Sequence, residues 1–204
     1  HIYNYNIFTM PNISYNKLED QNKVNFTSEA HVNSLTFSAN IINDFPISLF
    51  NISDIKILSL LRIGLNGIID VEFPQSLIAI DLSHNKITSF SEKCIRSMKN
   101  LLALNISFNN INELPDAFSI IGTGDEKFHL SKFFADHNRI SNIPTSLLSS
   151  NFMEQFSVSN NKIHHLGQFR WPKLKMFNVS FNHLKELPDA FESSSLLQEV
   201  NVSF

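Results

Sequence analysis

A chain of 204 residues is long enough to bury the core of one domain or of two small ones. With 16 basic and 19 acidic residues, a net charge of −3 and no basic run, it lacks the clustered positive charge of a nucleic-acid surface. No apolar stretch approaches the roughly 20 residues of a membrane-spanning helix, so membrane insertion is not expected. The single cysteine, Cys94, excludes an intrachain disulfide and a cysteine metal site and favours a reducing compartment.

The first 31 residues are polar and irregular. Within them ISYNKL, from Ile13 to Leu18, is a weak copy of a pattern that recurs downstream. We expect residues 1–31 to form an N-terminal cap or a degenerate repeat, because stacks of repeats need capping units that shield their terminal cores. Residues 32–204 are expected to form one repeated domain.

From residue 32 onward the chain repeats the pattern L-x-x-L-x-L-x-x-N-x-L-x-x-L-P, in which L is any apolar residue. The clearest copies are LIAIDLSHNKITSF (77–90), LLALNISFNNINELP (101–115) and LKMFNVSFNHLKELP (174–188). Eight copies in register predict a periodic structure, and because the last is truncated we expect a piece of a longer chain. The copies begin at Val32, Ile55, Leu77, Leu101, Leu130, Met153, Leu174 and Leu197.

Two positions of the pattern have a direct structural meaning. Positions 4 to 6 alternate apolar, polar and apolar, which is the period of a short, half-buried strand. Position 9 is an asparagine, whose amide can donate and accept hydrogen bonds at once and so can satisfy the backbone of neighbouring turns. Ile63 replaces it in the second copy, where we expect a local irregularity. The position-9 asparagines are Asn40, Asn85, Asn109, Asn138, Asn161 and Asn182.

These copies resemble the leucine-rich repeat family. The resemblance implies an α/β solenoid: a right-handed horseshoe with a parallel β-sheet on its concave side and mostly irregular or 3₁₀ segments on its convex side. Position 18 is expected to line the convex side of the core, and we interpret Cys94 there as a small buried apolar residue rather than a nucleophile. The position-18 residues are Leu49, Cys94, Phe118, Leu147 and Phe191.

No constellation for catalysis or metal binding emerges. His84 and His137 lie two copies apart, roughly 10 Å at about 4.8 Å per strand, too far to share one metal without a bridging ligand. The stretch GTGDEK (122–127) lacks the spacing of a phosphate-binding loop and is interpreted as a surface loop. We therefore predict no enzymatic activity, no metal and no cofactor, and no small-molecule substrate is evident.

Several N-x-[ST] triplets would be glycan acceptors in a secreted protein. An asparagine-rich chain with serine at position 7 produces such triplets by itself, and we favour this explanation, with glycosylation as the alternative. The triplets begin at Asn12, Asn25, Asn51, Asn105, Asn178 and Asn201.

Binding is expected on the concave face, through the outward positions 2, 3, 5, 7 and 8. Aromatic residues ringed by mixed charges are typical of protein-interface hot spots. Phe134 at position 5 is the sharpest candidate, whereas the position-8 aromatics could instead pack over the strand edge. The candidate residues are Asp81, His84, Asn105, Phe108, Lys132, Phe134, Asp136, His137, Glu154, Met176, Asn178 and Phe181.

Two functions remain open. The first is a non-catalytic protein–protein interaction module, the recognition or regulatory segment of a larger cytoplasmic signalling protein. The resemblance extends to intracellular chains that join such repeats to phosphatase 2C-like, kinase or cyclase domains. The alternative is an extracellular receptor ectodomain that binds a foreign or peptide ligand. Both place a protein partner on the concave face.

Overall fold

The computed structural model describes residues 32–38, 45, 50, 52, 54–115, 117, 130–189 and 191–203. The predicted cap at 1–31, the predicted loop at 122–127 and the predicted core or ladder residues Asn40, Leu49 and Phe118 lie outside the described residues. Within the described part, no helix has the length and apolar character needed to cross a membrane.

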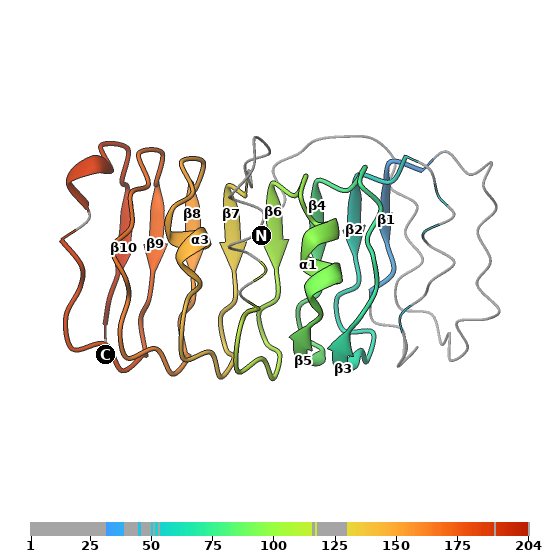
Figure 1. Ribbon diagram of the computed structural model, residues 1–204, viewed down its shortest axis with the longest axis horizontal. Helices are drawn as coiled ribbons and strands as arrows, with labels where there is room; N and C mark the ends of the chain where they lie inside the picture. The colour runs from blue at the N-terminus through green and yellow to red at the C-terminus, as the bar shows by residue number, and fades with distance from the viewer. Residues whose placement is uncertain are drawn as a thin grey trace.

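Eight short parallel strands form one continuous sheet, with one strand from each predicted copy (Figure 1). Every strand occupies positions 3 to 5 of its copy, and neighbouring strands pair position for position, as Leu104 does with Phe133. Each position of the repeat therefore forms a row across the sheet. In sheet order the strands are β1 (Ser34–Thr36), β2 (Ile57–Ser59), β4 (Ala79–Asp81), β6 (Ala103–Asn105), β7 (Lys132–Phe134), β8 (Gln155–Ser157), β9 (Met176–Asn178) and β10 (Glu199–Asn201).

The inward side of the sheet covers a continuous hydrophobic core. The position-4 residues Leu58, Ile80, Leu104 and Phe133 are almost completely buried, as the alternating pattern predicts for a sheet with one buried face. The structure is thus the predicted α/β solenoid with a parallel sheet: no single strand buries its apolar side alone, and stacking of copies makes the core continuous.

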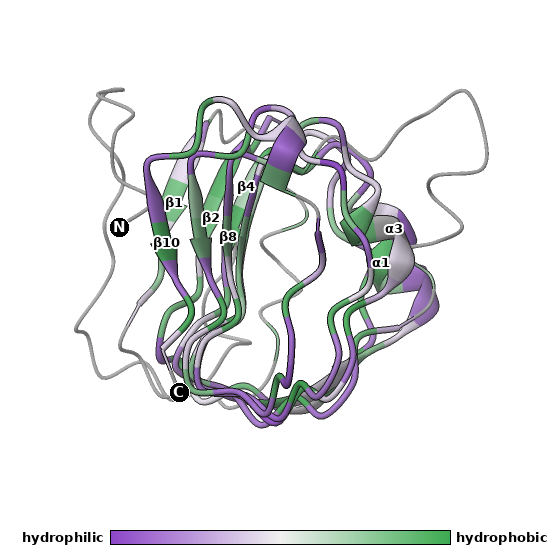
Figure 2. Ribbon diagram, turned by 90° about the vertical axis from the view of Figure 1, so that its left-hand side faces the viewer, coloured by the Kyte–Doolittle hydropathy of each residue, from purple (hydrophilic) through white to green (hydrophobic). Residues whose placement is uncertain are grey.

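The side of the solenoid opposite the sheet is mostly irregular and carries short helices (Figure 2). The helices α1 (Glu92–Ser97) and α3 (Thr145–Leu148) lie there, and the last full copy carries the 3₁₀ helix η3 (Phe191–Ser193). Cys94 and Leu147 are fully buried there, and Phe191 packs edge-on against Phe177 with ring centroids 5.1 Å apart. The expectation that position 18 lines this side of the core is confirmed for these three residues.

The second copy contains the expected irregularity. Because Ile63 cannot act as a ladder asparagine, Asn85 Oδ1 accepts hydrogen bonds from the backbone N–H groups of Ile63, Gly64 and Leu65 at 3.0–3.1 Å. Gly64 and Gly67 have positive φ angles, 88° and 74°, that suit glycine. The chain then forms an additional parallel pair, β3 (Asn66–Ile69) with β5 (Lys86–Phe90), whose register shifts between Gly67 and Ile68.

Candidate binding surface

The outward side of the sheet, called the sheet face here, is formed by the residues at positions 2, 3 and 5 of each copy. Strand register places Phe134 between Asn105 and Ser157, about 4.8 Å from each neighbouring strand. The structure brings together seven predicted site residues on this face, all half-buried: Asp81, Asn105, Lys132, Phe134, Glu154, Met176 and Asn178.

An apolar strip lies beside them on β2, β4 and β6. Leu102 is 40% exposed, and its backbone N–H donates to Ile78 O at 2.8 Å, so the two position-2 residues are neighbours. The small residues Ala79 and Ala103 pair at position 3. Leu102 was not predicted as a site residue, although a leucine at an outward position was a sufficient signal. The strip consists of Ile57, Ile78, Ala79, Leu102 and Ala103.

Charges occupy the other half of the sheet face. Lys175 Nζ donates to Glu154 Oε2 at 2.7 Å, and Lys132 lies on the neighbouring strand β7. Positions 2 and 3 of the sheet face are therefore apolar at β4 and β6, whereas they carry charged side chains at β7 to β9. Position 5 is polar on every strand except β7, where it is Phe134.

Position 7 is not an outward-facing position, contrary to the sequence-based prediction. The serines there are buried, with exposed fractions of 3% for Ser83 and 6% for Ser107. Asp136 stands at the same position, and its Oδ1 accepts from Ser157 Oγ at 2.5 Å and from Ser159 N and Oγ at 2.7 and 2.8 Å. These bonds hold β7 to β8, so this carboxylate has a structural role.

The position-8 residues form a separate row at the carboxyl ends of the strands, the lower edge of the sheet in Figure 1. All have left-handed backbone conformations with φ between 51° and 57°. For residues other than glycine this conformation costs roughly 1–2 kcal/mol of conformational free energy per residue. The repeat pattern did not predict this conformation. The row consists of Arg62, His84, Phe108, His137, Asn160 and Phe181.

Three rings of this row stack on one another. Phe108 lies between His84 and His137, with centroid distances of 4.2 and 4.3 Å and interplanar angles of 8° and 15°. The predicted alternative that position-8 aromatics pack over the strand edge thus holds for Phe108, although 43% of it remains exposed. Burial, followed by the nearby Arg62 charge, lowers the pKa of His84, while Asp81 acts in the opposite direction. Phe181 is 56% exposed and lies outside the stack.

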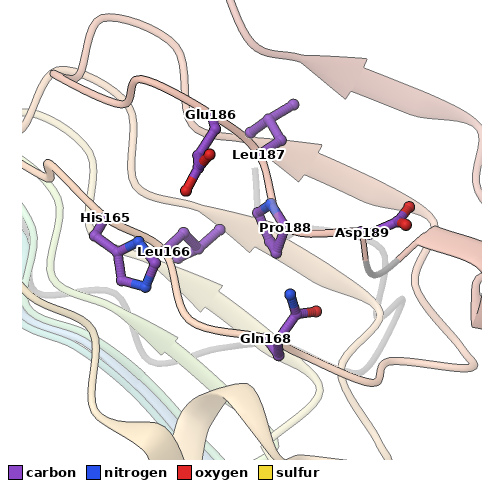
Figure 3. Close-up of a pocket in the computed structure, with 7 residues that line it drawn as sticks. All are labelled: His165, Leu166, Gln168, Glu186, Leu187, Pro188 and Asp189. Carbon is purple, nitrogen blue, oxygen red and sulfur yellow. The ribbon is translucent and has the colours of Figure 1, made fainter.

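The described residues also include one small pocket and one buried thiol. A small polar pocket of about 230 Å³ lies on the C-terminal side of the repeats (Figure 3), below the usual size of a small-molecule site. Its lining residues are His165, Leu166, Gln168, Glu186, Leu187, Pro188 and Asp189. In the part of the chain that the structure describes, no three His, Cys, Asp or Glu residues gather as metal ligands. Burial raises the pKa of Cys94 to about 12, so its thiol is not activated.

Comparisons with known proteins agree with this architecture. Residues 72–119 match the family model described as leucine rich repeat. The chain is 26% identical to bovine (Bos taurus) osteomodulin over 95% of its own length and 48% of that protein, and 28% identical to chicken (Gallus gallus) lumican over 69% and 48%. It therefore spans about half the length of the curated relatives that it matches.

A solved structure shares the fold. The TLR13–ssRNA13 complex matches 84% of this chain and 29% of that chain, with a TM-score of 0.54 at 20% identity. A strand from each copy at the same repeat positions, buried asparagines linking neighbouring turns and the family-model match point to one conclusion. The repeats of this chain are leucine-rich repeats, and residues 72–119 match that family's model.

Proposed function

We propose that the chain is a non-catalytic recognition module of an extracellular protein and that it binds a protein ligand on the sheet face. The observation that carries the binding half is the mixed character of the sheet face: exposed Leu102 lies among the apolar residues of the strip, and charged side chains together with the Phe134 ring lie on the neighbouring strands. An apolar centre with a polar rim is the usual anatomy of a protein interface. The proposed contact residues are Leu102, Asp81, Asn105, Lys132, Phe134, Glu154, Met176 and Asn178.

A rigid scaffold supports this surface. The side chains at positions 3 and 5 stand on strands that are hydrogen-bonded on both sides, except on the outermost strands β1 and β10, and those at position 2 directly precede these strands. Such a surface needs little ordering when a ligand binds, which lowers the entropic cost of association. Truncating Leu102 and Phe134 removes apolar contact area without leaving a buried polar group unpaired. Substitutions at these two positions should therefore weaken ligand binding and leave the stability of the fold nearly unchanged.

The extracellular location replaces the intracellular one as the favoured hypothesis. Osteomodulin and lumican are extracellular matrix proteoglycans, and a further relative, 29% identical over 60% of the chain, is chicken Toll-like receptor 2 type-1. The lone cysteine, which favoured a reducing compartment, is a buried residue of α1, where it packs as a small apolar residue in either compartment.

The extracellular location makes the N-x-[ST] triplets testable acceptor sites. Asn178 and Asn201 are outward on β9 and β10, and the Oδ1 of each accepts from the Oγ of the serine two residues later, at 2.7 and 2.9 Å. Peptide mapping by mass spectrometry of the protein isolated from its source is expected to find N-glycan on at least one triplet. Unmodified asparagine at every triplet would favour the cytoplasmic signalling function instead.

The occupied triplets would also delimit the ligand surface. Asn105 pairs directly with Phe134 across β6 and β7, so a glycan on Asn105 would cover part of the proposed interface. The proposal therefore expects Asn201, which is exposed at the edge of the sheet, to be modified more fully than Asn105.

A further inference from the structure

A second row of side chains runs parallel to the position-8 row, two residues further along each copy. Its backbone N–H groups donate to the position-11 carbonyl of the preceding copy, as Arg139 does to Ile111 O at 2.8 Å and Lys162 does to Ile140 O at 2.9 Å. The same bond recurs in five successive copies, so the side chains stand one per repeat. The row consists of Lys86, Asn110, Arg139, Lys162 and His183.

The two rows together, called the carboxyl edge, carry positive charge on a chain whose net charge is −3. Four full cations lie in them, Arg62, Lys86, Arg139 and Lys162, all exposed, together with three imidazoles. Neither row contains a carboxylate. Among the described residues, the ion pairs lie elsewhere, within α1, between α1 and Asp70, and on the sheet face, and they leave these cations unneutralised.

The carboxylates that lie nearest to these cations along the repeat already accept hydrogen bonds from serine residues. Asp136 Oδ1 accepts three hydrogen bonds from Ser157 and Ser159, and Asp81 Oδ1 accepts from Ser83 N at 2.9 Å. Exposed Glu113 lies three positions beyond the position-10 row. The edge is thus a linear band of positive charge along the solenoid, about 19 Å from Lys86 to His183 at about 4.8 Å per repeat.

We propose that the carboxyl edge binds a sulfated polysaccharide chain. Full cations at position 10 of three of the five copies, Lys86, Arg139 and Lys162, suit an extended polymer that carries anionic groups along its length, because each of them can neutralise one anionic group. Sulfate groups accept hydrogen bonds from lysine, arginine and imidazole donors in charge-assisted geometry.

The ring stack favours a polysaccharide over a single-stranded nucleic acid. Proteins that hold unpaired bases stack them on the open faces of aromatic side chains. Here both faces of Phe108 are covered by His84 and His137, at 4.2 and 4.3 Å, so only ring edges point to solvent. The edge therefore offers charge and hydrogen-bond donors in its centre but no base-stacking platform there.

The test is binding of the whole 204-residue chain to immobilised heparin at 0.15 M NaCl, measured by biolayer interferometry with a salt titration. The edge variant is Lys86→Gln/Arg139→Gln/Lys162→Gln. Its matched control, Lys56→Gln/Arg170→Gln/Lys173→Gln, removes the same charge from exposed cations outside both rows. Thermal unfolding of both variants is recorded, and single Lys162→Gln is used if the triple edge variant unfolds.

We expect the edge variant to weaken heparin binding at least tenfold and to flatten the salt dependence, since fewer counterions are released on binding. The control is expected to stay within twofold of the original chain. Equal weakening by both variants, or no binding by the original chain, would overturn the proposal. Tighter binding of poly-uridylate RNA than of heparin would overturn it in favour of a nucleic acid.

Discussion

Asn109 and Ile87 join two successive repeats: Oδ1 of the asparagine accepts the backbone N–H of the isoleucine at 3.0 Å. Nδ2 of Asn109 donates at the same time to Leu82 O at 3.1 Å, one repeat away, and to Ile106 O at 3.0 Å in its own repeat. One buried side-chain amide therefore makes hydrogen bonds to backbone groups of two successive turns. Asn138, Asn161 and Asn182 repeat the arrangement, which makes the solenoid continuous.

Replacing Asn109 by leucine is expected to lower the free energy of unfolding by about 1–3 kcal/mol or more, because one N–H and several carbonyls lose their buried partner. Urea denaturation followed by the fluorescence of the single tryptophan measures the loss. The neighbouring Asn110→Leu is the control, since Asn110 is half-buried and lies outside the ladder. Equal stability of the two variants would mean that the ladder contributes nothing.

Asp136→Ala is expected to destabilise the fold by about 1–3 kcal/mol, because Ser157 Oγ and the N–H and Oγ of Ser159 lose their acceptor. Glu113→Ala removes the same charge from an exposed position and should change stability little. The comparison is a pair of thermal melts. If both variants have the same melting temperature as the original chain, the Asp136 carboxylate has no structural role and is available to a ligand, as predicted from the sequence.

The sequence predicted the architecture well because one signal was repeated many times. The repeat placed each strand, the ladder asparagines and the irregularity at Ile63, since each depends on local backbone requirements that recur in every copy. Side-chain relations between copies were not predictable in this way. The burial of position 7 and the stacking of Phe108 depend on neighbouring turns. The left-handed conformation of position 8 belongs to each turn, but residues as different as Arg62, Phe108 and Asn160 carry no common sequence signal for it.

The candidate site was predicted in part for the same reason. Outward strand positions follow from the alternation of a strand, so Phe134 and Lys132 were found. His84, Phe108, His137 and Phe181 were assigned to the same face, but they belong to the turn that follows it. Leu102, which is exposed at the outward position 2, was not among the predicted site residues.

The pKa of His84 is expected to lie below 6.5, with burial as the main cause, and to rise toward that value in Phe108→Ala. The titration of the imidazole protons by NMR measures it. Phe181→Ala removes a position-8 aromatic outside the stack and should leave the pKa unchanged. A pKa that is the same in all three chains would show that Phe108 does not shield the ring.

The lowered pKa of His84 also has a consequence for stability. The unfolded chain binds the proton more tightly than the folded one, so the contribution of this group is present above about pH 6.5. It is lost as the pH falls through the folded-state pKa. In His84→Gln, the free energy of unfolding should therefore decline less steeply between pH 7.5 and 5 than it does in the original chain. Parallel declines would contradict this.

Cys94 is expected to be unreactive in the folded protein, since it is fully buried and burial raises its pKa to about 12. Its labelling by a thiol reagent such as Ellman's reagent at pH 8 should appear only with unfolding in urea, at the midpoint reported by tryptophan fluorescence. Rapid labelling without denaturant would place the thiol at the surface.

The most direct test of the proposed function is ligand capture from extracellular fluid or matrix extract of the source tissue, with quantitative mass spectrometry. The original chain is compared with Leu102→Ala/Phe134→Ala and with Ile68→Ala/Leu187→Ala, a control that truncates exposed apolar residues away from the sheet face. The account predicts a protein that is retained by the original chain and the control and lost only with the sheet-face variant. Equal capture by all three chains, at equal thermal stability, would contradict a ligand site on the sheet face.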